Sequence, residues 1–318
     1  MKHWWPAKLG SMSGYGEEDS TGKSLMTLGA IALFSFVFLF YWDVFTLLER
    51  TSASFRTSFL PDSVIFFWRM SCLLVSIYAI IYMFRMKTGT MVVLDHDTRS
   101  EIILHPLGIR KFVTFSSWTL ICSVVYFLLA TLSSFSLFFG SVLPTWINTA
   151  QVLFFTMALG AGFLTSTVVR YVILPAEVKQ KRVHEHQFYF HNQMMHNFTT
   201  IFLAFEIVLV QPELRPHFAI FGLLIGTLYA LFAFPFAYFG GGYYVYSFID
   251  PRLKLAPLFV SGLAGAISVF YLGLWLLSLL VEYNGLIGGV AVVIWLSLIV
   301  QFQPEDIEYE VETNSIQG

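Results

Sequence analysis

The sequence predicts an all-α polytopic membrane protein: a bundle of about eight transmembrane helices with a short surface β-hairpin. Of its 318 residues, 57% are hydrophobic and only 12% are charged. An average soluble domain has about 45–50% apolar and about 25% charged residues. The apolar runs are continuous and mostly about 18 residues or longer, as in transmembrane helices, whereas barrel strands alternate over about 10 residues. The composition therefore excludes a soluble globule, a coiled coil and a disordered chain.

Eight apolar segments predict the crossing helices. They cover residues 25–48, 64–84, 113–139, 148–174, 197–211, 217–239, 255–281 and 285–302. The fifth is short before Gln211-Pro212, so it should start deep or lean on the preceding loop, and Gly240–Gly242 should end the sixth. The predicted order is a polar N-tail (1–24), two spans with the hairpin (25–107), a core (108–281), an extra span (282–303) and an acidic tail (304–318).

The Lys and Arg residues set the expected orientation, because cytoplasmic loops of membrane proteins carry an excess of them. With eight crossings, most of the 18 Lys and Arg residues fall on the side of the N-terminus. The opposite side collects only Arg50, Arg56 and Arg215. We therefore expect an integral, multi-pass protein with both termini on the cytoplasmic side, or on the matrix or stromal side in an organelle.

Two loops and the C-tail on the basic side have a predictable character. Short apolar runs, Met91–Leu94 and Glu101–Leu104, flank the polar residues 95–100 and predict a β-hairpin on the membrane surface. Residues 176–190 mix basic and aromatic side chains, which favours an amphipathic interfacial helix. The five carboxylates between Glu305 and Glu312 indicate either a solvated tail or a docking segment for a protein partner.

The sequence lacks the common signatures of reactive sites. It has no phosphate-binding glycine loop, no paired Cys-x-x-Cys, no His-Glu-x-x-His and no Gly-x-Ser-x-Gly elbow. Four histidines (His184, His186, His191 and His196) crowd one stretch, but their spacing matches no standard ligand pattern. We therefore expect no metal and no cofactor, and without a basic block we expect no nucleic-acid partner.

Polar residues inside the predicted spans are candidates for function, because they are costly in a bilayer and usually face the bundle interior. Arg69 and Arg170 lie near span ends, from which their side chains could reach the interface. Glu206 lies about ten residues into the fifth span, where a carboxylate must be neutral or paired. It is therefore either half of a structural pair or a site residue.

Thr114 and His196 share a geometric property. Thr114 opens the third span and His196 opens the fifth, and both spans enter from the same side. The two side chains therefore lie at similar depth and could touch if the helices are neighbours. A hydroxyl beside an imidazole is the minimum unit for acyl transfer. The alternative is a helix N-cap for Thr114 and an interfacial position for His196.

Around these residues the sequence resembles the androgen-induced and androgen-dependent membrane proteins, which hydrolyse fatty acid esters of hydroxy fatty acids. The resemblance covers about residues 108–281. It rests on Lys111-Phe112-Val113-Thr114, on Asn192-Gln193-Met194-Met195-His196 with Glu206 ten residues later, on Gly242–Phe248 and on Phe270–Gly273. The family usually has His at Gln193, Trp at Tyr244 and Pro at Ser247, so the match is incomplete.

The resemblance implies an integral membrane hydrolase with Thr114 as the nucleophile and His196 as the base. Its substrate would be a long-chain lipid ester that enters from the bilayer into a tunnel lined by phenylalanines. Arg110 and Lys111, next to Thr114, would bind a lipid carboxylate, and Asn192 and Glu206 are further candidates for substrate binding. The alternatives are a non-catalytic subunit of a larger membrane complex that keeps the family fold, and a transporter.

Overall fold

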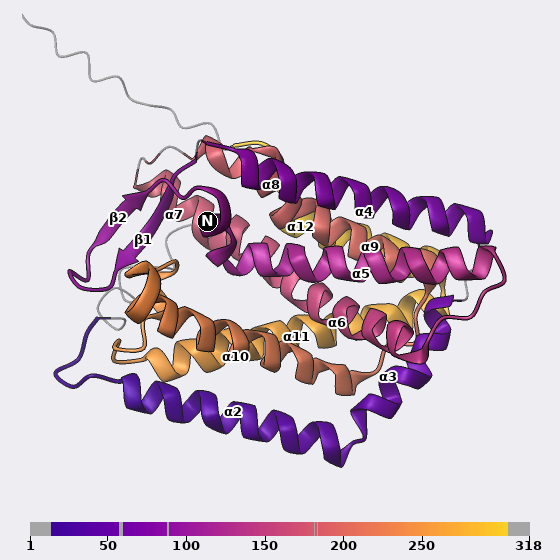
Figure 1. The fold of residues 1–318 in the computed structure, drawn as a ribbon, viewed down its shortest axis with the longest axis horizontal. Coiled ribbons are helices and arrows are strands. Elements are labelled where there is room, and N and C mark those ends of the chain that lie inside the picture. The colour runs from indigo at the N-terminus through magenta and orange to yellow at the C-terminus, as the bar shows by residue number, and fades with distance from the viewer. Residues whose placement is uncertain (1–13, 57–59, 88, 181, 183, 305–318) are drawn as a thin grey trace, which may run out of the picture.

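The computed structural model describes residues 14–304, apart from 57–59, 88, 181 and 183. In this part of the chain, seven helices are long and apolar enough to cross a membrane, and an eighth apolar helix is shorter. They run side by side along the long axis of the molecule, with the hairpin at one end (Figure 1). The protein is thus an all-α, multi-pass membrane bundle, as predicted. The acidic tail after Glu305 lies outside the described residues.

The crossing helices are built from the following elements. The single helices are α2 (Thr21–Tyr41), α4 (Asp62–Arg85), α5 (Phe115–Phe138), α11 (Ala256–Tyr283) and the short α12 (Gly285–Ile299). Helix α10 (Ile220–Pro235) is extended by a 3₁₀ turn before it and a π-helical turn after it, so that this crossing helix covers Pro216–Gly241. Two others are composite: α6 (Thr145–Val168) continues into α7 (Leu174–Lys179), and α8 (Phe190–Gln193) continues into α9 (Thr199–Val210). A π-helical turn joins the two parts in each case.

The structure corrects three predicted boundaries. The first segment, 25–48, is not one helix, because α2 ends at Tyr41 and α3 (Val44–Ser52) starts after Asp43, whose φ of 44° is left-handed. Aspartate is one of the few residues that tolerate this conformation. The fifth crossing helix begins earlier than predicted, at Phe190. Residues 176–190 do not form one interfacial helix, because α7 ends at Lys179 and a 3₁₀ turn follows at Glu185–Phe188.

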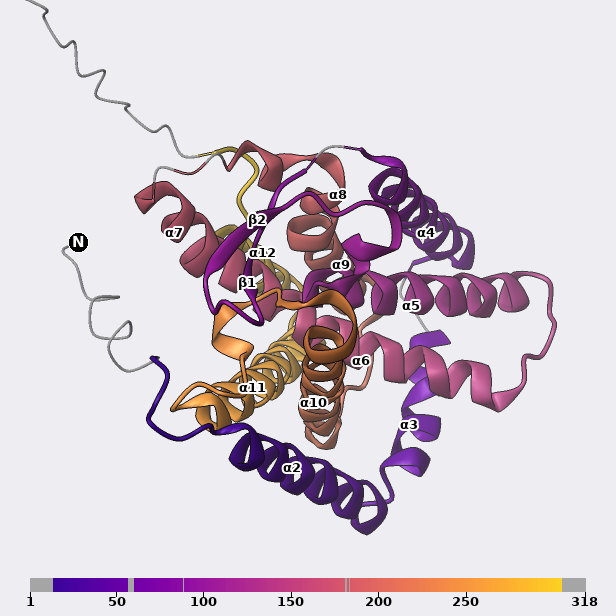
Figure 2. The same cartoon turned by 60° about the vertical axis from the view of Figure 1, so that its left-hand side comes forward.

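The predicted hairpin is present and has a third strand. Strand β1 (Met91–Asp95) pairs antiparallel with β2 (Glu101–Leu104), with Met91 opposite Leu104. On its other edge β1 pairs with β3 (Tyr243–Tyr244), which follows α10. Figure 2 shows this small sheet over one end of the bundle. Both described chain ends lie there too, since Tyr15 bridges to Leu253 and Gln301 is hydrogen bonded to Asn197.

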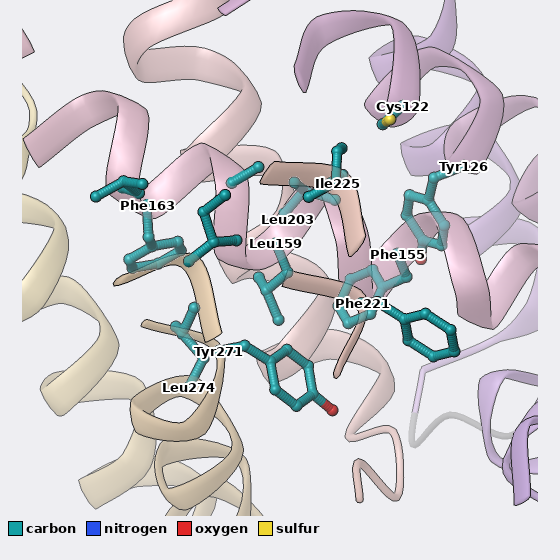
Figure 3. Close-up of a cluster of buried hydrophobic side chains, with 14 of the residues drawn as sticks. Cys122, Tyr126, Phe155, Leu159, Phe163, Leu203, Phe221, Ile225, Tyr271 and Leu274 are labelled. Carbon is teal, nitrogen blue, oxygen red and sulfur yellow. The ribbon is translucent and has the colours of Figure 1, made fainter. Parts of the chain in front are cut away.

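Helix α6 forms the centre of the bundle. It packs against α3, α5, α9, α10 and α11, and Phe155, Leu159 and Phe163 are fully buried. Figure 3 shows these side chains among those of neighbouring helices, such as Leu203, Phe221 and Tyr271. Only 22% of the apolar stretch of α2 is buried, against 72% for α6 with α7, so α2 is peripheral and turns most of its surface outward. A centre packed in this way leaves space for a ligand only toward the ends.

Small residues let α10 and α11 approach closely. A Cβ atom built on Gly222 would lie 2.7 Å from the backbone nitrogen of Ser268, and one on Gly226 would lie 2.8 Å from the Cα of Ala264. The Gly222-x-x-x-Gly226 spacing is typical of membrane helices that pack backbone to backbone.

We expect Gly222→Ala to lower the free energy of unfolding by about 1–3 kcal/mol, because the added methyl group must push α11 away. The matched control is Gly262→Ala in α11, where a Cβ meets nothing within 4 Å. Thermal unfolding of both variants in the same detergent measures the difference. Equal melting temperatures would contradict the packing argument.

Candidate active site

A cavity of about 330 Å³ lies beneath the hairpin, at the end of the bundle. Its walls come from β1, the start of α5, the turn between α6 and α7, the start of the α8–α9 helix and the loop after β3. The side chains that line it include many with hydrogen-bonding or titratable groups: Lys111, Thr114, Ser116, Glu177, Gln180, Arg182, His186, Gln187, His191, Asn192, His196, Tyr246 and Ser247. Phe248 is the only phenylalanine among the lining residues. This cavity is therefore not the predicted phenylalanine-lined tunnel, because the phenylalanines lie mainly in the packed centre or on the outer surface of the bundle.

Thr114 is the N-cap of α5 and also lines the cavity. Its backbone is extended (φ −79°, ψ 149°), and its Oγ1 accepts a hydrogen bond of 3.2 Å from the backbone N–H of Ser117. The two hydroxyl groups, of Thr114 and Ser117, are 2.9 Å apart. The N-cap prediction is confirmed, and it is compatible with a site role because the side chain is only half-buried. The start of a helix carries a partial positive charge that favours an oxyanion.

His196 lies in the π-helical turn Met194–Phe198, which joins α8 to α9. Its side chain is 8% exposed, and its Nδ1 is buried without a hydrogen-bond partner among the described residues. The turn is held by the hydroxyl of Ser166, which donates to the carbonyl oxygen of His196. A π-helical turn inserts one extra residue into a helix and is frequent at functional sites. A second such turn, Val169–Ile173, contributes Val172 and Ile173 to the same cavity.

Thr114 and His196 line the same cavity, although they come from different helices. Among the described residues, no hydrogen bond joins the two side chains, and the hydroxyl of Thr114 is bonded within its own turn. The structure thus places hydroxyl and imidazole on one cavity without a hydrogen bond between them. Such contacts are often long or poorly aligned without substrate.

Two further predicted residues reach the cavity, and one does not. Lys111 is 7% exposed, and its Nζ donates to the carbonyl oxygen of Met86 at 2.6 Å, while burial lowers the pKa of its ammonium group. Asn192 donates to the carbonyl oxygen of His186 at 2.7 Å. Arg110 is exposed and does not line the cavity. Arg110 and Lys111 are neighbours in a 3₁₀ turn of about three residues per turn, so their side chains point in different directions.

Glu206 lies away from the cavity, in a buried ion pair with Arg69. Nη2 of Arg69 is 3.0 Å from Oε2 of Glu206, and both side chains are 1% exposed. Trp68 and Tyr126 also donate to this carboxylate, at 3.0 and 2.7 Å. Arg69 therefore does not reach the interface, and the structure places Glu206 in a structural pair. Arg170, by contrast, donates to the carbonyl oxygens of Ser297 and Val300 at the end of α12.

Sequence reasoning missed Tyr246. Its ring lines the cavity, and its hydroxyl lies against the first turn of α5. Burial raises the pKa of Tyr246, and hydrogen bonding from the side chain of Ser116 and from the backbone of Phe115 and Ser116 opposes that rise. Tyr246 falls within the Gly242–Phe248 motif, but nothing in the spacing indicates that this loop folds back over α5. Among the described residues, no three His, Cys, Asp or Glu side chains are grouped so as to hold a metal ion.

Fold and cavity together define a class: an integral, multi-pass membrane protein of the helical-bundle type, with a cavity at one end that is lined by both apolar and polar side chains. Comparison with models of known families, with characterised proteins and with solved structures finds no match. The chemistry of the cavity must therefore be argued from its own residues.

Proposed function

We propose that the protein is a membrane hydrolase of lipid esters, with Thr114 as the nucleophile and His196 as the general base. The observation that carries the proposal is that these two side chains, far apart along the chain, line one cavity at the end of the bundle. The sequence resemblance to the androgen-induced family of membrane hydrolases supports the same two roles.

In the proposed reaction, His196 takes the proton of the Thr114 hydroxyl as Oγ1 attacks the ester carbonyl carbon. The tetrahedral intermediate collapses when the C–O bond to the alcohol breaks, and His196 returns the proton to the leaving oxygen. A water molecule then attacks the acyl-threonine and loses a proton to His196, the bond between the acyl carbon and Oγ1 breaks, and His196 returns the proton to Oγ1. The products are a fatty acid, an alcohol and the free Thr114 hydroxyl.

The surroundings suit this chemistry. Thr114 stands at the start of α5, a helix of 24 residues, whose free N–H groups and dipole favour the negative charge that develops on oxygen. The phenol of Tyr246 lines the same space and is a candidate donor to the oxyanion. Lys111 supplies a cation for an acidic substrate.

The position of the cavity sets the depth of the scissile ester. It lies beneath the surface hairpin, and a packed core separates it from the centre of the bundle. We therefore propose that the ester is cleaved near the membrane–water boundary, with the acyl chain remaining beside the helices. The excess of Lys and Arg at this end supports a cytoplasmic, matrix or stromal location for the site and both termini. An impermeant thiol reagent applied to Thr98→Cys in sealed vesicles tests that orientation.

Covalent labelling tests the nucleophile. We expect a fluorophosphonate probe to modify the purified protein at Thr114, with loss of labelling in Thr114→Ala. The matched control is Thr119→Ala, which removes a buried hydroxyl from the same helix that does not line the cavity. Labelling that survives in Thr114→Ala, or that disappears only in Ser116→Ala, would overturn the assignment of Thr114.

The second candidate function is a non-catalytic subunit of a membrane complex. One observation favours it: the hydroxyl of Thr114 is already engaged as a helix cap. Under this proposal the cavity has no reactive group, and the probe modifies neither Thr114 nor another lining residue. The labelling experiment therefore separates the two candidates directly.

A further inference from the structure

A second cavity, of about 530 Å³, lies between α2 and α10 and shares no lining residue with the first. Helix α2 begins at the hairpin end of the bundle and α10 ends there. The cavity therefore has one end beside the polar hairpin and another between the apolar parts of the two helices. The polar end is formed by Asp19 just before α2, by His96 and Arg99 at the hairpin turn, and by Arg252 in the turn before α11. Leu25, Leu231 and Phe234 form the apolar end, deeper along the two helices. We call this cavity the α2–α10 groove.

At the polar end, Arg252 is already ion-paired and Asp19 accepts a hydrogen bond from the backbone of Thr21. Nη2 of Arg252 is 2.7 Å from Oδ2 of Asp250, and its Nη1 donates to the carbonyl oxygen of His96 at 2.7 Å. Asp19 accepts a hydrogen bond of 2.7 Å from the N–H of Thr21. The guanidinium of Arg252 and the carboxylate of Asp250 thus already neutralise each other.

Arg99 is different, because among the described residues it has no ion pair. Its guanidinium is exposed and lies 4.5 Å from the ring centre of Tyr15. This stacking orients the planar group and leaves its N–H donors available, and a guanidinium is well suited to bind phosphate by two hydrogen bonds. Arg99 also has a left-handed φ of 56°, an uncommon conformation for a residue other than glycine.

The groove is open along its apolar side. Leu25 is 48% exposed, Leu231 is 43% exposed and Phe239 is 83% exposed. Tyr238 and Phe239 lie near the polar end, where aromatic residues of membrane proteins meet the headgroup region. An acyl chain could therefore enter from the bilayer between the two helices without crossing a polar wall.

We propose that the α2–α10 groove binds one phospholipid, with its phosphate on Arg99 and an acyl chain along Leu25 and Leu231. The charge pattern selects among phospholipids: Asp19 stands beside the cations, so a headgroup with an ammonium next to its phosphate fits better than one with a net negative charge. The bound lipid would tie the peripheral helix α2 to the bundle. This proposal does not depend on the hydrolase proposal.

Native mass spectrometry of the purified full-length protein tests the site. We expect phosphatidylcholine to bind in a one-to-one complex, and Arg99→Ala to weaken that complex about tenfold, the loss expected for one charge-assisted hydrogen-bonded contact. The control is Arg85→Ala, an exposed arginine that does not line the groove. Equal binding by Arg99→Ala and the unmodified protein would overturn the proposal.

Two fragments of the lipid separate its contributions. Diacylglycerol lacks the phosphate, and glycerophosphocholine lacks the chains, so both should bind at least tenfold more weakly than phosphatidylcholine. Glycerophosphocholine binding as tightly as the whole lipid would show a free phosphate site and contradict the proposal. Leu231→Trp fills the groove without changing its charge, and it should weaken phosphatidylcholine binding while the melting temperature stays within a few degrees. Undiminished binding in this folded variant would also contradict the proposal.

Discussion

Replacing Arg69 by methionine should lower the free energy of unfolding by about 3–5 kcal/mol, the range for breaking a buried ion pair. The guanidinium is 1% exposed and bonds the carboxylate of Glu206, the hydroxyl of Ser134 and the carbonyl oxygen of Phe55. Without Arg69, the carboxylate of Glu206 remains in the bundle with only Trp68 and Tyr126 as donors. Glu206→Gln should lower the free energy of unfolding by a similar amount, because it leaves the buried guanidinium of Arg69 without a negatively charged partner.

The double variant Arg69→Met/Glu206→Met separates the effect of an unpaired charge on stability from the effect of altered side-chain packing. Removing both charges leaves no unpaired ion, so its loss of stability should be smaller than that of either single variant. The control is Arg215→Met, which breaks an exposed ion pair with Glu213 and should change stability by less than about 1 kcal/mol. Unfolding in mild detergent measures the stability of the four variants relative to the unmodified protein. A loss in Arg69→Met no larger than that in Arg215→Met would contradict the argument.

The fold was largely predictable because its main signal is local. Segment length and hydropathy predict helices, and the short apolar runs on either side of the polar residues 95–100 predict the β1–β2 hairpin, which the structure confirms. What the sequence did not predict depends on distant contacts. The break at Asp43 turns α3 onto α6, and β3 pairs with β1 only because the end of α10 meets the hairpin. The early start of the fifth helix, at Phe190, requires a π-helical turn that hydropathy cannot show.

The candidate site was predictable in part, for a similar reason. Thr114 and His196 each stand at the start of a span that enters from the same side, and this equal depth places both on one cavity. Lys111 reaches the same cavity because it is three residues before Thr114. Adjacency failed for Arg110, because consecutive residues in a 3₁₀ turn diverge. The position of Glu206 inside a span indicated that its carboxylate needs a partner, but the sequence does not show that the partner is Arg69. The two residues are on different helices, and only tertiary packing brings these helices together. The same holds for Tyr246, in a loop that folds back over α5.

Thr114→Ala is expected to lower kcat/KM for a long-chain ester by about 1,000-fold or more, because the substitution removes the hydroxyl proposed as the nucleophile. It should also cost about 1 kcal/mol of stability, since the alanine cannot cap α5. Thr114→Ser retains both the cap and the hydroxyl, so it should keep activity within about tenfold and stability within about 0.5 kcal/mol. The serine variant thus separates chemistry from capping.

His196→Gln should lower kcat/KM by about 100- to 10,000-fold, the usual contribution of a general base, while the buried amide keeps the size of the side chain. Release of fatty acid from a chromogenic ester in detergent micelles measures the rates, and thermal unfolding of each variant measures its folding. If Thr114 and His196 had only structural roles, each variant would lose activity only in proportion to the fraction of protein that is unfolded. Full hydrolysis by a folded Thr114→Ala protein would leave Thr114 as a helix cap and assign the nucleophile to another group, whereas no hydrolysis by the unmodified protein would make the non-catalytic subunit the better account of this cavity.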